Sequence, residues 1–327
     1  MAPLVSVILC TYNQAEFLRD AIESVLTQTH PEIELIVIDN GSQDDSARII
    51  AEYASRPGVR PLIHTENDHV TKRLNGAVAL SRGAFVSFLF GDDYYLPEKI
   101  ERQVARFQTL GPEYAVVYGP GYRLEVNTGE RWLLTGFSAS GMVGRELLLS
   151  YHLASINPIA PLFRRHVLTE HPLHEDLFLE STESLLMRLS LYHPFSYLDE
   201  PLVVMRSHSG NAAKAYAWNT ENNLVLLDRI AREPGFPADI RARWIGIKAQ
   251  SLRHLAWLSL RLRRNQREAR GYLRRAIAMD PRELLAPRTI AALFLSALPH
   301  PVLDLVNAAV KRRRGHPRDL EFKDDIS

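Results

Sequence analysis

The segment "FVSFLFGDDYYLPEKI" (residues 85–100) runs from six mostly apolar residues directly into two adjacent carboxylates, Asp92 and Asp93. An uninterrupted apolar run of this length is typical of a parallel strand that is buried on both faces. Pro97 suits the first turn of a following helix. In open α/β sheets, ligands bind outside the carboxyl ends of the strands. The segment therefore predicts a sheet whose edge presents two negative charges to a ligand.

Strands and helices alternate on both sides of this segment. We expect strands at 4–10, 33–38, 61–65 and 114–120, and helices at 13–30, 47–55, 72–83 and 97–110. Asn13 with Glu16 three residues later predicts a capping box, and Gly83 a helix end. Alternation at roughly ten- to fifteen-residue spacing predicts an α/β fold with a mostly parallel central sheet and flanking helices.

Three polar loops follow three of the expected strands. They are Thr11-Tyr12-Asn13, Asp39-Asn40-Gly41-Ser42 and Asp92-Asp93. Because the carboxyl ends of parallel strands meet at one edge of a sheet, these loops are predicted to form a single site.

Bulk composition narrows the function classes. The 327 residues are 46% hydrophobic and 24% charged with a net charge of +1, which is typical of a soluble globular protein and gives no reason to expect a nucleic-acid partner. Cys10 is the only cysteine, so a disulfide framework is excluded and a reducing cytoplasm is favoured. We expect no secretory signal and no membrane span, since the longest late apolar run, 290–298, is far below about 20 residues.

The character of the chain changes after about residue 211. Long Arg- and Leu-rich helical stretches follow, so we expect one domain over 1–211 and a helical C-terminal region over 212–327. The basic run "VKRRRGHPR" (310–318) has two interpretations: contact with an anionic membrane on its inner face, or a solvated helix end. Oligomerisation through these helices is a further expectation.

The chain lacks the usual phosphate-binding loops. No G-x-x-x-x-G-K-[ST] is present, and "GPGYRL" (119–124) lacks the third glycine of a dinucleotide fingerprint. A divalent cation on carboxylates could hold phosphates instead, and Asp92 and Asp93 have the hard oxygen ligands that Mn²⁺ or Mg²⁺ prefers. The alternative is that Asp93 only caps the following helix.

Several motifs in order resemble the family 2 glycosyltransferases. They are "SVILCTYN", "LTQT", "ELIVIDNGSQD" and the acidic pair after the strand at 85–90, and the resemblance covers roughly residues 4–210. It implies a GT-A fold and an inverting, metal-dependent enzyme that uses nucleotide-sugar donors.

The resemblance assigns the first two loops to the nucleotide. Thr11, Tyr12 and Asn13 would lie against the base and ribose, and Asp39 would accept a hydrogen bond from a uracil or thymine N3–H. Many relatives carry a second carboxylate after this position. Here it is Asn40, which leaves one acid at the base site.

The acidic motif and the cations around it are also implied by resemblance. Relatives have Asp-x-Asp-Asp, whereas Phe90 replaces the first Asp here, so Asp92 would hold the metal and diphosphate with Asp93 beside it. In "MRSHSGN", Arg206 would lie near the diphosphate and His208 near the metal. "KRLN" stands where relatives have Ala-Arg-Asn, so Lys72, Arg73 and Asn75 are the expected diphosphate contacts; a solvated helix start is the alternative for the two cations.

The general base is the least defined member of the expected site. In relatives it is an Asp about six residues before an Arg that Arg188 matches, but that position here is Thr182. Glu183 and Glu180 flank it, and Glu183 is favoured; the alternative is that both are exposed acids at a helix start. The pair Glu175-Asp176 lies too far ahead of Arg188 to match.

The expected activity is transfer of a hexosyl group from a UDP- or dTDP-sugar to a hydroxyl of a saccharide, lipid-linked or protein acceptor. A rival reading is a non-catalytic nucleotide-sugar-binding scaffold, because acids are missing at positions 40 and 90. A second rival, nucleotidyl transfer, would need a basic loop near the N-terminus, and "CTYNQAEF" contains no Lys or Arg.

Overall fold

The computed structural model describes residues 2–150, 156–176, 182–208, 210–211, 224–261 and 264–314. The chain divides into two compact units, one formed by Met1–Leu147 with Ser155–Ala215 and the other by Leu148–Ala154 with Tyr216–Ser327. The second unit also contains a short segment from earlier in the chain, and the boundary expected at residue 211 stays a prediction.

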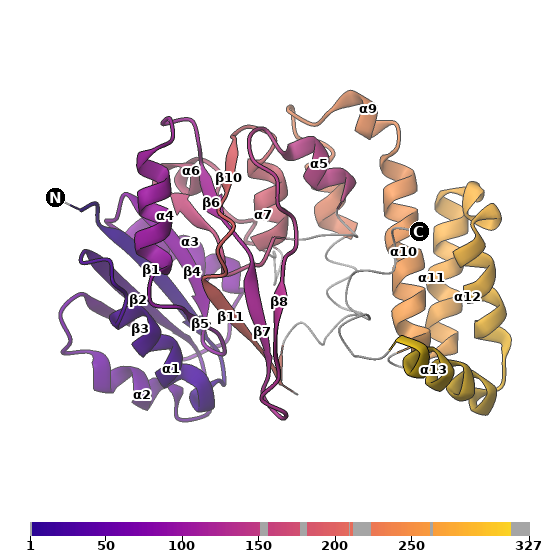
Figure 1. The fold of residues 1–327 in the computed structure, drawn as a ribbon, viewed down its shortest axis with the longest axis horizontal. Coiled ribbons are helices and arrows are strands. Elements are labelled where there is room, and N and C mark those ends of the chain that lie inside the picture. Colours follow the sequence, from indigo (N-terminus) through magenta and orange to yellow (C-terminus); the bar gives the residue numbers. More distant parts are fainter. Residues whose placement is uncertain are drawn as a thin grey trace. The chain divides into compact units, whose positions relative to one another are not determined.

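A seven-stranded sheet forms the centre of the first unit (Figure 1). Its order is β10 (Phe195–Tyr197), β6 (Val116–Tyr118), β9 (Leu162–Arg164), β4 (Phe85–Phe90), β1 (Val5–Thr11), β2 (Ile33–Asn40) and β3 (Val59–His64). Only β9 runs antiparallel to its neighbours. The prediction of a mostly parallel sheet is confirmed.

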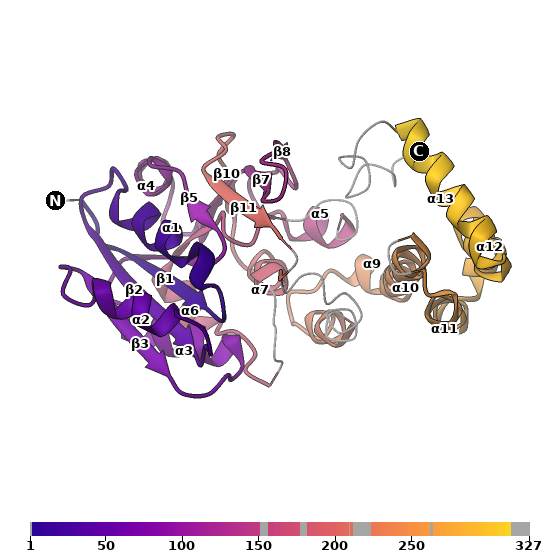
Figure 2. The same ribbon diagram turned by 90° about the horizontal axis from the view of Figure 1, so that it is seen from below.

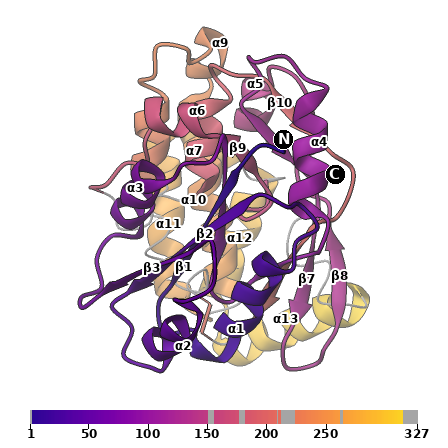
Figure 3. The ribbon, with the colours of Figure 1, turned by 90° about the vertical axis from the view of Figure 1, so that its left-hand side faces the viewer.

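Helices cover both faces of this sheet. Alternate strand residues such as Val7 and Val37 pack with α1 (Ala15–Leu26), α2 (Ser46–Tyr53) and α4 (Lys99–Gln108) in one buried cluster. On the opposite side lie α3 (Val70–Leu80) and α6 (Arg165–Glu170), which pack together, as Figure 3 shows. The remaining helices of this part are α5 (Gly144–Leu149) and α7 (Thr182–Leu189). Burial of the strands on both faces explains their continuous apolar sequences.

A second, four-stranded sheet has the order β5 (Tyr94–Tyr95), β11 (Val203–Ser207), β7 (Gly121–Glu125) and β8 (Arg131–Leu134). β7 and β8 form an antiparallel hairpin, with Gly129 in its turn at a φ of 71°. Because β5 directly follows the acidic pair and pairs with β11, the sheet brings residues 203–207 beside that pair.

The predicted capping box at α1 is wrong. Asn13 has a left-handed φ of 54°, and α1 begins at Ala15 after Gln14, whose side chain makes no capping bond. The cap comes instead from a distant loop, since Asp44 Oδ2 accepts the Ala15 N–H at 2.9 Å. A carboxylate at a helix N-terminus is favoured by the unpaired N–H groups there.

Gly83 does not end α3 in the way that was predicted. The helix ends at Leu80 with Ser81 as an extended C-cap, and Gly83 is not among the residues with positive φ. A Cβ at Gly83 would lie 2.6 Å from the main-chain N of Ser6, so the close approach of β1 explains this glycine.

The second unit is helical, which confirms the expected C-terminal extension. Residues 224–230 are helical. They are followed by α9 (Ala238–Arg241), α10 (Trp244–Arg261), α11 (Gln266–Met279), the 3-10 helix η2 (Pro281–Leu285), α12 (Pro287–Ala297) and α13 (His300–Arg314) (Figure 2). They share an apolar core that includes Leu252, Leu273 and Leu303.

None of the helices in the described residues combines the length and the apolar character that crossing a bilayer requires.

Candidate active site

Strand register brings the three polar loops to one edge of the sheet. Thr11 pairs with Asp39 across β1 and β2, and Cys10 pairs with Phe90 across β1 and β4. Burial raises the pKa of the Cys10 thiol to about 12, so this residue stays protonated and acts as a small hydrophobe. The carboxyl ends of β1, β2 and β4 therefore lie side by side, as the sequence pattern predicted.

Gly91 joins two of these loops. Its N–H donates to the Cys10 carbonyl at 3.1 Å, and a Cβ at this position would lie 2.4 Å from Thr11 Oγ1. Real Cβ atoms do not approach so closely. Residue 91 must therefore be glycine if Asp92 is to follow β4 at this point.

Asp92 is buried and held by two side chains from the segment after β11. Its Oδ2 lies 3.2 Å from His208 Nε2 and 3.0 Å from Asn211 Nδ2. The N–H of Gly210 donates to His208 Nδ1, so in this arrangement Nε2 carries the ring proton and donates to Asp92. Coordination of a metal by Nε2 would require that proton to move and the Gly210 bond to break.

Asp93 is buried beside Asp92, and its Oδ1 accepts the Arg206 N–H at 2.8 Å. Burial, and then the neighbouring Asp92 charge, raise the pKa of Asp93 well above its usual value. The folded chain therefore binds more protons than the unfolded chain between the two pKa values, and stability falls as pH rises through that window. A cation at this position would relieve the repulsion.

Arg206 stabilises the acidic turn through hydrogen bonds and ring contacts of its guanidinium group. Its guanidinium donates to the Asp92 carbonyl at 3.1 Å and to Asp20 Oδ2 at 2.6 Å. The same group lies over the rings of Tyr94 and Phe17, at 4.6 and 5.3 Å from their centroids. Its side chain is only 10% exposed, so these contacts fix it in place.

The loop after β2 is tied to the start of α3. Asp39 is buried, and its Oδ1 accepts the Ser42 N–H at 3.1 Å. Asn40 Nδ2 donates to the Asp68 carbonyl, while its Oδ1 accepts from Arg73 Nε at 2.9 Å. Asn40 therefore places an amide where many relatives have a second acid, and the amide nitrogen and oxygen both have hydrogen-bond partners.

The loop after β1 is fixed in a similar way. Asn13 N–H donates to Ser42 Oγ at 2.9 Å, and Asn13 Oδ1 accepts the Gln43 N–H at 2.7 Å. Thr11 is buried, whereas Tyr12 is 42% exposed. Tyr12 and Asn13 are both exposed, and Tyr12 is the one that offers an aromatic ring to a planar ligand.

The expected diphosphate contacts on α3 have protein partners. Lys72 forms an exposed ion pair with Asp68 at 2.9 Å, and Arg73 donates to the Glu66 carbonyl as well as to Asn40. Asn75 exchanges hydrogen bonds with the main chain of Leu173 and donates to Glu175 Oε1. Their contact with a diphosphate stays a prediction.

The general base also stays a prediction. Glu183 is the second residue of α7, and Glu180 lies outside the described residues. Arg188 holds the chain ahead of α7 by donating to the Pro172 carbonyl at 2.5 Å. Glu175 lies against the start of α3, where its carbonyl is 2.6 Å from His69 Nδ1.

Lys99 was not foreseen, and it is fully buried next to the acidic turn. Its Nζ donates to Ser87 Oγ at 2.8 Å and to Gln103 Oε1 at 3.0 Å, and lies 4.1 Å from the Tyr95 ring centroid. Burial lowers the pKa of Lys99 well below its usual value. We interpret it as a structural donor that fixes β4, β5 and α4 together.

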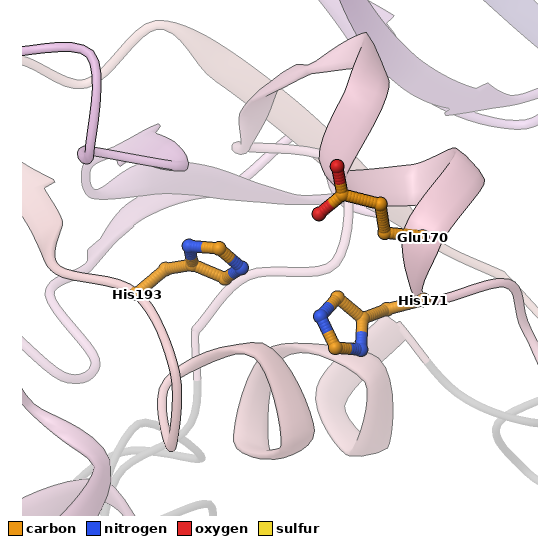
Figure 4. A group of neighbouring side chains, drawn as sticks. All are labelled: Glu170, His171 and His193. Atoms are coloured by element: carbon orange, nitrogen blue, oxygen red, sulfur yellow. The ribbon is translucent and has the colours of Figure 1, made fainter.

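A second group of polar side chains lies apart from the acidic pair, at the ends of α6 and α7. Glu170, His171 and His193 direct a carboxylate and two imidazole rings toward one another (Figure 4), with ligand atoms within 4.8 Å. Burial and the neighbouring His171 lower the pKa of His193.

The family model for "Glycosyl transferase family 2" matches residues 6–171, which is half of the chain. The chain belongs to this family. An uncharacterized glycosyltransferase of Rickettsia bellii is 36% identical over 39% of this chain and 18% of its own length. Another from Nostoc sp. is 33% identical over 50% of this chain and 52% of its own length. The chain thus matches only part of these relatives.

Solved structures with the same fold extend over nearly the whole chain. S. aureus TarS 1-349 in complex with UDP matches with a TM-score of 0.60 and 19% identity, over 96% of this chain and 92% of that one. The mannosyltransferase PcManGT from Pyrobaculum calidifontis, in complex with GDP-Man and Mn²⁺, matches with a TM-score of 0.58 and 14% identity, over 95% and 81%. At these identities the likeness shows the GT-A fold.

Sequence reasoning missed four residues of this site. Asn211 and Asp20 were not singled out, although they contact Asp92 and Arg206 respectively. Gly91 was noted only as a neighbour of the acids, and Lys99 only as part of a helix. The Gly-Asn in "SHSGN" is a local turn signal. Such a turn after His208 could bring the Asn211 side chain to the acidic pair.

Proposed function

We propose that the enzyme transfers a sugar from a nucleoside-diphosphate sugar to an acceptor hydroxyl with inversion at the anomeric carbon. The observation that carries the proposal is the strand register, which unites Thr11, Asp39 and the Asp92 turn at one sheet edge. Family membership supports glycosyl transfer, and the loops at this edge are the ones that we propose to recognise the base and to bind the metal.

The proposed donor is linked to UDP or dTDP. A buried Asp39 carboxylate would accept a hydrogen bond from the N3–H of uracil or thymine, and exposed Tyr12 offers a ring for stacking. TarS, whose fold this chain shares, has been solved with UDP and with UDP-GlcNAc. Because PcManGT was solved with GDP-Man, a guanine donor belongs in the same assay.

We propose Mn²⁺ or Mg²⁺ as cofactor, with Asp92 as its protein anchor. The donor set fits, because a buried carboxylate next to a second one suits a hard cation. Such a cation would neutralise charge on the leaving diphosphate. His208 and Asn211 orient the Asp92 carboxylate, and Arg206 with Asp93 fixes β11 against the turn. Lys72, Arg73 and Asn75 remain the proposed contacts on the α3 side.

The acceptor hydroxyl must lose a proton, and we keep Glu183 and Glu180 as the proposed bases. Asp176 becomes a third candidate, since the preceding Glu175 lies against His69 and Asn75 at the start of α3. The proposed acceptors are saccharide, lipid-linked and protein hydroxyls. We also propose a cytoplasmic location, on the ground that the single cysteine is a buried free thiol.

Release of nucleoside diphosphate from a panel of UDP-, dTDP- and GDP-sugars, with Mn²⁺ and with EDTA, tests the proposal. We expect metal-dependent turnover, strongest with a UDP- or dTDP-sugar. Binding without turnover of any donor, in the presence of crude acceptor extracts, would favour the non-catalytic scaffold that Phe90 and Asn40 suggest.

A further inference from the structure

The cluster of Glu170, His171 and His193 is built like a transition-metal site. Glu170 and His171 are consecutive residues at the end of α6, and His193 lies in the short connection between α7 and β10. Their ligand atoms lie within 4.8 Å of one another, and Figure 4 shows them turned toward a shared space. Ligand atoms about 2.1 Å from a tetrahedral ion are about 3.4 Å apart, so only a small side-chain adjustment is required.

His193 supplies the observation that points to a ligand. Its Nε2 is buried and has no hydrogen-bond partner within the described part of the chain. A buried polar atom left in this state destabilises the fold unless a ligand satisfies it. The main chain of Glu113 raises the pKa of His193, and because Nε2 has no partner we assign this interaction to Nδ1–H. The bond would leave a lone pair on Nε2 that faces Glu170 and His171.

This arrangement matches the second shell of metal-binding histidines, which usually donate their other N–H to a carbonyl or carboxylate. His171 is also oriented, because its ring stacks on Tyr192 with a centroid distance of 5.2 Å. Two imidazoles and one carboxylate suit Zn²⁺ rather than Mg²⁺ or Mn²⁺.

We propose that Glu170, His171 and His193 bind Zn²⁺ or a similar borderline-soft cation, with water as the fourth ligand. The ion would join the end of α6 to the segment that leads into β10. It is separate in residues and in ligand type from the Asp92 site, and it does not depend on the proposed transferase activity.

Zn²⁺ titration of the full chain against a chromophoric indicator tests the site, in an Asp92→Asn background that disables the acidic site. We expect one equivalent to bind, Co²⁺ to give a four-coordinate visible spectrum, and the melting temperature to rise with Zn²⁺. His193→Asn keeps a donor for Glu113 but removes the ligand, and should weaken binding at least about tenfold.

The matched control is His166→Asn, an exposed histidine in the same helix, which should bind Zn²⁺ as the parent does. Equal affinity in the His193→Asn and His166→Asn proteins, or no saturable binding by the parent at micromolar Zn²⁺, would overturn the proposal.

A separate observation concerns the outer face of α12 in the helical unit. The residues that α12 buries are small or polar, namely Thr289, Ala292 and Ser296. Its exposed face carries Ile290 at 53% and Phe294 at 66% relative exposure. Leu293 and Leu295 of the same helix pack partly buried against the core, so α12 divides its large apolar residues between the core and solvent, unlike the usual surface helix.

Two further exposed leucines lie in the elements that precede and follow α12 in the chain. Leu285 of η2 and Leu305 of α13 are 81% and 70% exposed. We call Leu285, Ile290, Phe294 and Leu305 the apolar face. Exposed groups of this kind mark interaction sites more often than single apolar residues do.

Charge indicates which partner covers this face. The segment 281–314 contains six Lys or Arg and two acids, and Lys311, Arg312, Arg313 and Arg314 are the last residues of α13. We propose that the apolar face lies on an anionic lipid bilayer, to which the net positive charge of segment 281–314 is attracted. Apolar insertion and basic attraction together give the two signals that stable peripheral binding needs.

Co-sedimentation of the full chain with phosphatidylcholine vesicles, with and without about 30% phosphatidylglycerol, tests this surface. We expect binding to the anionic vesicles and at least about a tenfold loss for Ile290→Ser with Phe294→Ser, because about 0.8 kcal/mol is lost for each CH₂ no longer buried. Leu133→Ser, at a 49% exposed leucine of β8, is the matched control.

Binding of the double variant to anionic vesicles as strong as that of the parent would overturn the membrane assignment. Self-association without lipid that the double variant abolishes would also overturn it, in favour of a second copy of the chain as the partner.

Discussion

Asp92→Ala is expected to reduce donor turnover in saturating Mn²⁺ by about 10²–10³-fold or more, the range seen when one preorganised charge-stabilising group is removed. Asp92 is the buried acid that His208 and Asn211 hold at the end of β4. Without it, the proposed cation has no protein anchor, and charge that develops on the leaving diphosphate is not neutralised. Initial rates of nucleoside diphosphate release measure the effect.

The variant should remain folded, which separates this result from simple unfolding. Removing Asp92 also removes the like charge that contributes to the raised pKa of Asp93. Stability at pH 8 should therefore be close to that of the parent, although His208 and Asn211 lose one acceptor. Asp45→Asn, at an exposed acid paired with Arg48, is the control and should keep full activity. Parent-level turnover by Asp92→Ala would refute the metal assignment.

Gly91→Ala is expected to lower both stability and activity, although it adds a single methyl group. The new Cβ would lie 2.4 Å from Thr11 Oγ1 and 2.8 Å from Gln14 Oε1. Thr11 cannot withdraw, because it is buried in β1 between two hydrogen-bonded strands. The main chain at residue 91 must move and will carry Asp92 with it. Overpacking of this kind costs about 1–3 kcal/mol, measurable by urea unfolding.

Gly76→Ala is the matched control for this substitution. Gly76 is an exposed residue of α3, and nothing lies within 4 Å of a Cβ built there. Alanine should stabilise this helix by up to about 1 kcal/mol without a change in turnover. If the Gly91→Ala and Gly76→Ala proteins have the same free energy of unfolding and the same donor turnover, the tight junction between the β1 and β4 loops is not required.

The sheet and its binding edge could be predicted because their signals are local. Continuous apolar runs identify buried parallel strands, and the loops that follow them must share an edge. Thr11, Asp39 and Asp92 were found in this way, and β-strand register confirms that their loops are neighbours. The helical C-terminal unit could be predicted equally well from its long Arg- and Leu-rich stretches.

Contacts between distant segments could not be predicted. The cap of α1 comes from Asp44 rather than Asn13, and Asn211 reaches Asp92 across more than a hundred residues. The sequence pattern predicts that Gly83 ends a helix, whereas in the structure its lack of a side chain allows β1 to approach closely. Each of these features depends on a tertiary contact, which the local periodicity of the sequence does not reveal. The Zn²⁺ cluster combines residues 170, 171 and 193, which no sequence spacing connects.

Calorimetric titration of the full chain with UDP, in the presence and in the absence of Mn²⁺, is the decisive test of a metal-assisted nucleotide site. We expect saturable binding of one UDP per chain that requires the cation and is lost in Asp92→Ala. UDP binding of equal strength with EDTA, or undiminished binding by Asp92→Ala in Mn²⁺, would contradict a metal-assisted nucleotide-sugar site at the end of β4.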